Sequence, residues 1–294
     1  MTVAGPPPAR RDAALLAWGI ALPAAAGAAA VLGFAPFYAW PLPIAALAVL
    51  FLAWARSGSA LQAAISGFAF GLALNLAGVS WVFVSLHEFG HMPAVLAAIA
   101  TFLFCAYLAL FPAAAGWAVH RFAAGGTRKL LAAMPAAFVL LEWVRGWLFT
   151  GFPWLAIGYS QAPASPLAGF APVLGAYGVS LAAAFSAALL AAFAASPAWS
   201  RRRAVLAIAF AGVLASGALL RLVAWTSPSG EPLSVALLQG NVPQHLKWRD
   251  DVRARTFRDY HAQAVRSPAR VVVLPETALP AFLDQLPPGY LESL

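Results

Sequence analysis

Long apolar stretches recur along the first three quarters of the chain, separated by short polar breaks. A helix that crosses a membrane needs roughly 20 mainly apolar residues. The stretches that reach about this length are seven: 13–32, 36–54, 60–82, 92–118, 130–149, 168–195 and 204–224. This pattern predicts a polytopic α-helical membrane bundle of about seven spans over residues 1–226.

The pattern changes after residue 226. A linker rich in Pro, Ser and Gly leads into the apolar run 234–241, an amphipathic helical pattern over 250–265, and a second β-branched run at Val271–Leu274. Strand, helix and strand in this order indicate an α/β unit with both strands buried. We predict that residues 227–294 form a separate domain, too small to cover both faces of its sheet without more chain or a partner.

Composition supports the membrane prediction and locates the charge. The chain is 62% hydrophobic and 10% charged, with a mean hydropathy of +0.80, values typical of integral membrane proteins. Residues 1–226 contain 11 basic and 3 acidic residues, whereas 227–294 contain seven of each. The net charge of +8 therefore belongs to the membrane part, where it reports topology, and no nucleic-acid partner is predicted.

The basic residues also predict an orientation. If the spans alternate, nine of the 11 basic residues in the first part fall on one side of the membrane: Arg10, Arg11, Arg56, Arg121, Arg128, Lys129, Arg201, Arg202 and Arg203. The positive-inside rule makes that side the cytoplasm. With seven spans the N-terminus is then cytoplasmic and residues 227–294 lie outside, in the periplasm of a Gram-negative cell.

Few side chains in the membrane part suggest chemistry. Cys105 lies in an apolar span with no nearby positive charge to stabilise a thiolate, so we interpret it as a core residue. His87, Glu88 and His91 lie in an outer loop and are too few for a metal site, which favours an ordinary solvated loop. No metal or cofactor is predicted.

Glu142 and Arg145 lie three residues apart near the end of the fifth predicted span and can share one helix face. Charges at membrane depth are costly and usually face a cavity or the bundle interior. Two interpretations remain open: a structural ion pair, or contact with a lipid headgroup or substrate. The aromatic stretch that follows, with Trp147 and Trp154, fits either a membrane-interface belt or a substrate site.

Glu276 follows the second apolar run of the α/β segment. The carboxyl edge of a parallel sheet is where α/β folds place their ligands and chemistry. A carboxylate at this edge can be a structural hydrogen-bond acceptor or a general base. The second role requires a nucleophile within hydrogen-bond reach.

Four segments together resemble the apolipoprotein N-acyltransferases, enzymes of the bacterial inner membrane that complete lipoprotein maturation. The resemblance runs from about Ala13 to Pro280. The segments that carry it are Phe34–Phe37; Glu142–Trp147 with Thr150–Trp154 and Gly158–Gln161; Leu238–Gln244 with Lys247 and Trp248; and Leu274–Ala278.

This resemblance implies a nitrilase-like α-β-β-α domain on the membrane bundle and a Glu-Lys-Cys triad. Such enzymes move an acyl chain from a phospholipid to the diacylglyceryl-cysteine at a lipoprotein's N-terminus, through a thioester. Glu276 matches the general base of the family, and Trp248 matches an aromatic residue near the acyl-chain entrance. We add Arg145, Trp147 and Trp154 as candidate substrate contacts. The implied partners are a phospholipid donor, the apolipoprotein and the membrane.

The chain departs from the family pattern after Glu276. The Lys and Cys of the triad, and a last membrane span, lie beyond this point in the family. Lys247 precedes Glu276 and Cys105 lies in the membrane part, so neither is a substitute. We therefore expect a truncated α/β domain and no activity of this chain alone. The alternatives are a membrane-anchored nitrilase-superfamily amidase and a non-catalytic lipid-binding membrane subunit.

Overall fold

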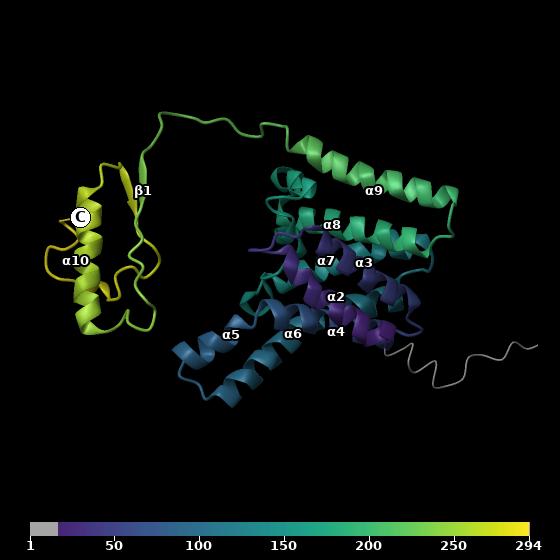
Figure 1. Ribbon diagram of the computed structural model, residues 1–294, viewed down its shortest axis with the longest axis horizontal. Coiled ribbons are helices and arrows are strands. Elements are labelled where there is room, and N and C mark those ends of the chain that lie inside the picture. Colours follow the sequence, from purple (N-terminus) through teal and green to yellow (C-terminus); the bar gives the residue numbers. More distant parts are fainter. Residues whose placement is uncertain (1–16, 294) are drawn as a thin grey trace, which may run out of the picture. The chain divides into compact units, whose positions relative to one another are not determined.

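The computed structural model describes residues 17–293. The chain divides into two compact units, Met1–Trp225 and Thr226–Leu294. The first consists of helices and is called the bundle below. The second contains two strands and one long helix and is called the α/β unit (Figure 1).

Helices occupy most of the described part of every predicted membrane stretch. Residues 13–16 of the first stretch lie outside the described residues. The main helices of the bundle are α2 (Leu22–Ala30), α3 (Pro41–Arg56), α4 (Ala60–Gly78), α5 (Trp81–Val84), α6 (Ala94–Phe122), α7 (Met134–Arg145), α8 (Ala171–Ala195) and α9 (Arg201–Leu220). Shorter turns extend them at Ala17–Ala21, Val31–Gly33, Ser85–Phe89, Lys129–Ala133 and Pro166–Phe170.

Within the described residues, four helical segments are long and apolar enough to cross a membrane. They are Ala60–Gly78, Ala94–Phe122, Pro166–Ala195 and Arg201–Leu220. Gly19–Gly33 and Pro41–Arg56 are apolar but shorter, and α7 has 12 residues. The bundle is thus a helical membrane protein with several candidate spans, and the full set of seven remains a prediction.

Helices α4 and α6 pack closely against each other in the bundle. Gly67 and Gly71, four residues apart on α4, face α6 where its backbone approaches. A Cβ atom at Gly67 would collide with the Pro112 carbonyl, and one at Gly71 would lie 2.9 Å from the Ala109 Cα. Small residues at this spacing allow two membrane helices to approach more closely than larger side chains would permit.

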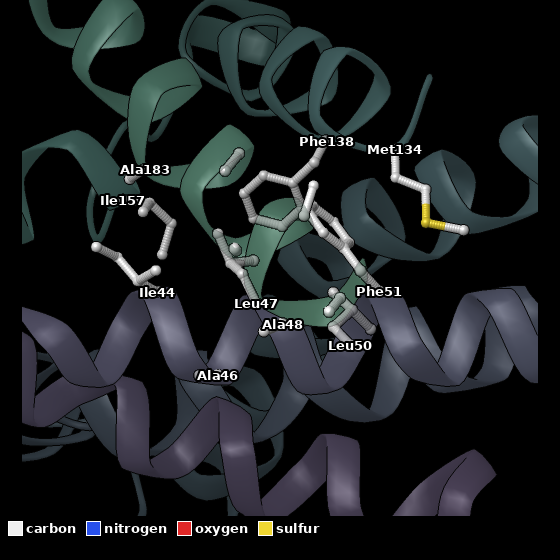
Figure 2. Close-up of a cluster of buried hydrophobic side chains, with 14 of the residues drawn as sticks. Ile44, Ala46, Leu47, Ala48, Leu50, Phe51, Met134, Phe138, Ile157 and Ala183 are labelled. Atoms are coloured by element: carbon white, nitrogen blue, oxygen red, sulfur yellow. The ribbon is translucent and has the colours of Figure 1, made fainter. Parts of the chain in front are cut away.

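The core of the bundle surrounds α3. Leu47, Leu50 and Phe51 are fully buried, and the Phe51 ring meets Phe138 of α7 edge-on at 6.4 Å. Figure 2 shows Ile157, from the segment after α7, close to Ile44 of α3 and reaching into the same cluster. Ile157 therefore joins this segment to the core formed by α3 and α7.

The α/β unit has a two-stranded parallel sheet of β1 (Val235–Leu237) and β2 (Val271–Val273), with Val235 opposite Val271. Helix α10 (Asp250–Arg266) connects them and buries Phe257 and Tyr260. The expectation that both strands are buried is wrong for this structure. Leu237 is 77% exposed and Val273 44% exposed, because in the described part of the unit α10 is the one long element available to cover the sheet.

Candidate functional site

Two of the sequence motifs meet at a pocket in the bundle. The pocket has a volume of about 540 Å³. Its lining combines the Phe34 segment, the end of α4 and the segment after α7: Val31, Phe34, Ala35, Tyr38, Gly78, Pro153, Trp154, Leu155 and Tyr159. We call this the bundle pocket.

The lining of the bundle pocket is aromatic and mostly apolar. Trp154 is 52% exposed, and its ring lies 5.5 Å from that of Trp81 and 6.0 Å from that of Phe152, centroid to centroid. Tyr38 and Tyr159 are the lining residues that carry hydroxyl groups. An apolar pocket with a few polar groups is the usual form of a site for a largely hydrophobic ligand.

The segment after α7 needs an unusual backbone to form this wall. The predicted helix over 130–149 ends at Arg145, and Phe149, Thr150 and Leu155 then take positive φ values of 51°, 72° and 56°. Gly151 has φ 76° and ψ 150°, a region open essentially to glycine alone. A Cβ atom there would also collide with the Gly146 carbonyl. Gly151 is therefore required for the turn.

Glu142 and Arg145 lie inside the bundle, with 5% and 6% of their surface exposed. Glu142 Oε1 accepts a hydrogen bond of 2.7 Å from the Ile157 backbone N–H. Glu142 Oε2 and Arg145 Nε have no hydrogen-bond partner within residues 17–293. The Glu142 carboxylate thus contacts the segment that carries Trp154, and the predicted role of Arg145 in substrate binding remains a prediction.

Trp147 lies outside the bundle pocket. It is 53% exposed and packs edge-on against Trp143, with 5.4 Å between ring centroids. An aromatic pair at the end of α7 suits a membrane-interface belt as well as a substrate contact. Its substrate role also stays a prediction.

The other two motifs meet at a pocket in the α/β unit. This pocket, about 180 Å³ in volume, lies at the carboxyl edge of the two strands. Its lining is Gln239, Gly240, Asn241, Val242, Lys247, Thr256, Tyr260, Pro275, Glu276 and Ala278. Glu276 is exposed in the turn after β2. The Gly240 backbone N–H donates to the Tyr260 hydroxyl at 3.0 Å, which joins the β1 motif to α10.

Lys247 is not expected from the sequence to substitute for the triad lysine. In the structure it nevertheless lines the same pocket as Glu276. The signal in the sequence is that Lys247 closely follows the Leu238–Gln244 motif, which lines the same pocket as Glu276. Trp248 itself is 61% exposed and is not among the residues that line this pocket. Cys105 is fully buried in α6, in the other unit, as a core residue would be.

Within residues 17–293, no group of three or more His, Cys, Asp or Glu side chains could hold a metal ion. His87, in the loop before α6, pairs its Nδ1 atom with the Met92 carbonyl at 2.8 Å.

An apolar helical bundle with an attached α/β unit, each with a motif-lined pocket, defines a multi-helix membrane protein of mixed architecture. Residues 26–189 match the family model described as the apolipoprotein N-acyltransferase N-terminal domain. Because this match covers more than half of the chain, the chain belongs to the apolipoprotein N-acyltransferase family.

Curated relatives agree over a longer stretch. An apolipoprotein N-acyltransferase of Nitrosomonas europaea is 49% identical over 272 residues, 92% of this chain and 54% of the relative. Proteins of the same name from Chromobacterium violaceum and Methylococcus capsulatus are 43% and 44% identical, over 92% and 89% of this chain and 52% and 51% of their own lengths. The chain spans about half the length of the curated relatives it matches.

Proposed function

We propose that this chain forms the membrane bundle and the first part of the catalytic domain of an apolipoprotein N-acyltransferase. The reaction moves an acyl chain from a phospholipid to the N-terminal diacylglyceryl-cysteine of a lipoprotein, through a thioester. The observation that carries the proposal is the grouping of the family motifs around two pockets, one in each unit. The name shared by the relatives supports it.

In this proposal Glu276 is the general base. Its carboxylate takes the proton of a thiol, and the thiolate attacks the ester carbonyl of the phospholipid. Glu276 returns the proton to the leaving oxygen as the lysophospholipid departs and the thioester forms. The α-amine of the lipoprotein then attacks the thioester carbonyl, the C–S bond breaks, and the amide forms as the thiol regains a proton. Cys105 is the single cysteine of these 294 residues. Since it is buried in the bundle, we propose that the thiol comes from further chain or from a partner, and so does the oxyanion-stabilising lysine, which the family pattern places beyond the Glu.

In this scheme the lipid is bound by the bundle pocket and by three side chains outside it. Trp154 forms a wall of the pocket that takes the acyl chain, and Trp248 lies near the acyl-chain entrance. We keep Arg145 and Trp147 as further substrate contacts. The α/β unit is proposed to be part of a nitrilase-like α-β-β-α domain, which agrees with its parallel strands joined by α10.

We further propose a multi-pass protein of the bacterial inner membrane, with seven spans, a cytoplasmic N-terminus and a periplasmic α/β unit. Arg202 donates a hydrogen bond of 3.2 Å to the Thr127 hydroxyl. This bond joins the loop after α6 to the first turn of α9, which supports placing their basic residues at the same end of the bundle. A periplasm-dependent reporter fused after Ser229 should be active, and activity of a cytoplasm-dependent reporter at this position would contradict the orientation.

Acyl transfer itself can be tested by joining this chain, at Pro280, to the remaining part of the Nitrosomonas europaea relative. The joined protein is expected to transfer a labelled acyl chain from phospholipid vesicles to a diacylglyceryl lipopeptide and to accumulate a labelled thioester without the lipopeptide. Hydrolysis of small amides without acyl transfer would support a membrane-anchored amidase instead. Lipid binding without either reaction would support a non-catalytic lipid-binding subunit.

A further inference from the structure

The segment Phe152–Ile157, which carries Trp154, is attached at both ends to the last turn of α7. The Phe152 N–H donates to the Arg145 carbonyl at 2.9 Å. The Ile157 N–H donates to Glu142 Oε1 at 2.7 Å. Glu142 and Arg145 are neighbours on one helical face, so a single turn of α7 holds the whole segment.

The attachment continues beyond Ile157. The Gly158 N–H donates to the Ser180 hydroxyl of α8 at 2.8 Å, and Gln161 Nε2 donates to the Trp40 carbonyl at 3.2 Å. Irregular backbone at membrane depth is tolerated where the protein itself satisfies its polar groups. Here side chains of α7 and α8 satisfy two consecutive N–H groups, and the Ile157 side chain is buried in the core (Figure 2).

A small cavity adjoins this attachment. It has a volume of about 20 Å³, and its lining includes Asn75 of α4, Glu142, Arg145 and Leu155. Three polar atoms of these side chains have no hydrogen-bond partner within residues 17–293: Asn75 Oδ1, Glu142 Oε2 and Arg145 Nε. The orientation of the Asn75 amide is set by its Nδ2 atom, which donates to the Gly71 carbonyl at 2.7 Å.

The chemistry of these three atoms matches one water molecule. Two of them are acceptors and the third is an N–H donor, whereas water donates twice and accepts. A cavity needs about 10–15 Å³ to hold a water, together with two to four polar partners. A direct Glu142–Arg145 hydrogen bond would satisfy both residues but would leave the Asn75 oxygen, on another helix, unsatisfied.

We propose that this cavity is a water-binding site and that Glu142 is a positioning residue for the bundle pocket. One carboxylate oxygen holds Ile157, and the other holds a water that also contacts Asn75 and Arg145. The water links α4 to α7 and thereby to the wall of the pocket that contains Trp154. The inference uses the proposed function only for the identity of the pocket's ligand.

Amide hydrogen exchange of the chain in phospholipid nanodiscs, followed by mass spectrometry of peptides covering 152–161, tests this proposal. In Glu142→Ala the exchange of this segment should rise about tenfold, as expected for loss of a buried hydrogen bond. Glu142→Gln keeps an oxygen acceptor for Ile157 and should change exchange less than about threefold. Asn75→Leu, which removes one partner of the water while preserving size, should give an intermediate rise.

Ser186→Ala is the matched control, because Ser186 is a buried hydroxyl that bonds only the Ala182 carbonyl of its own helix. It should leave the segment unchanged, and α3 peptides should be unchanged in all variants. An unchanged segment in Glu142→Ala, or an equal rise in α3, would overturn the positioning role. An unchanged segment in Asn75→Leu would overturn the water link. Exchange needs neither lipid turnover nor the thiol, so failure of this inference is separable from failure of the acyltransfer proposal.

Discussion

The bundle pocket and the α/β pocket differ in how they are supported. The bundle pocket, about 540 Å³, rests on a segment whose backbone is hydrogen-bonded to α7 and α8 and whose Ile157 side chain is in the core. The α/β pocket, about 180 Å³, contains an exposed Glu276 beside a sheet of two short strands. The first opens at the surface of the bundle, where Trp154 is 52% exposed, but its wall is anchored in the packed core, while the second lies at the edge of a small unit.

This difference suggests that the bundle pocket binds the ligand and that the α/β pocket takes part in the chemical step. An apolar pocket whose wall is anchored by hydrogen bonds can hold a largely hydrophobic ligand without further groups. An exposed carboxylate at the edge of a sheet has few neighbouring groups that hold it in place. Its action as a general base depends on a proton donor, such as a thiol, within hydrogen-bond reach. Substitutions in the bundle should therefore act through folding and binding, whereas those in the α/β unit should act on the chemical step with little effect on stability.

The largest expected effect is on chemistry. In the joined protein described above, Glu276→Gln should lower the single-turnover rate of thioester formation by about a thousandfold, as general-base catalysis contributes 10²–10⁴. Because Glu276 is exposed, the melting temperature should stay within about one degree. Retained thioester formation would show that Glu276 is not the base, and a large loss of stability would remove the contrast between the two pockets.

The next effect is on the bundle. Gly67→Leu should destabilise it by about 3 kcal/mol, because the added side chain meets the α6 backbone at Pro112 and overpacking in a tight core is costly. Gly212→Leu on α9 is the matched control, since a Cβ atom there meets nothing within 4 Å. Unfolding in mixed micelles with increasing SDS measures both. Equal stability of the two variants would contradict the close α4–α6 packing.

Local patterns predicted much of this architecture. Runs of about 20 apolar residues locate the helices because each helix satisfies its own backbone in lipid. Glu276 was expected at the carboxyl edge of a parallel pair, and the structure has it in the turn after β2. Both predictions depend on residues close together in the chain.

Features that depend on distant residues were not predicted. The hydrogen bond from Ile157 to Glu142 joins an irregular segment to a helix, and helical spacing alone suggested Arg145 as the partner. Phe34 and Trp154 line the same pocket although helices α3 to α7 separate them in the chain, so only the folded structure shows that their two motifs come together. The predicted start of a helix at residue 36 was early, since 34–40 forms turns such as the Phe37-to-Phe34 hydrogen bond before α3 begins.

A smaller effect is expected at the turn that shapes the bundle pocket. Gly151→Ala should cost about 2 kcal/mol, because alanine is strained at this φ and ψ. It should also weaken binding of a fluorescent phospholipid in micelles. Gly125→Ala, at an open position in the loop after α6, should change neither property. Full binding by Gly151→Ala would mean that the pocket does not depend on this turn.

The smallest effect separates two tryptophans of nearly equal exposure, Trp154 at 52% and Trp147 at 53%. Trp154 forms a wall of the bundle pocket and Trp147 packs on Trp143 outside it. Trp154→Ala should weaken phospholipid binding about tenfold, the loss of roughly 1.4 kcal/mol of contact, whereas Trp147→Ala, at a proposed contact outside the pocket, should weaken it by only about twofold. Titration of each variant with a fluorescent phospholipid measures this. Equal losses would show that the main binding site extends beyond the bundle pocket to Trp147. No loss for Trp154 would separate lipid binding from this pocket altogether.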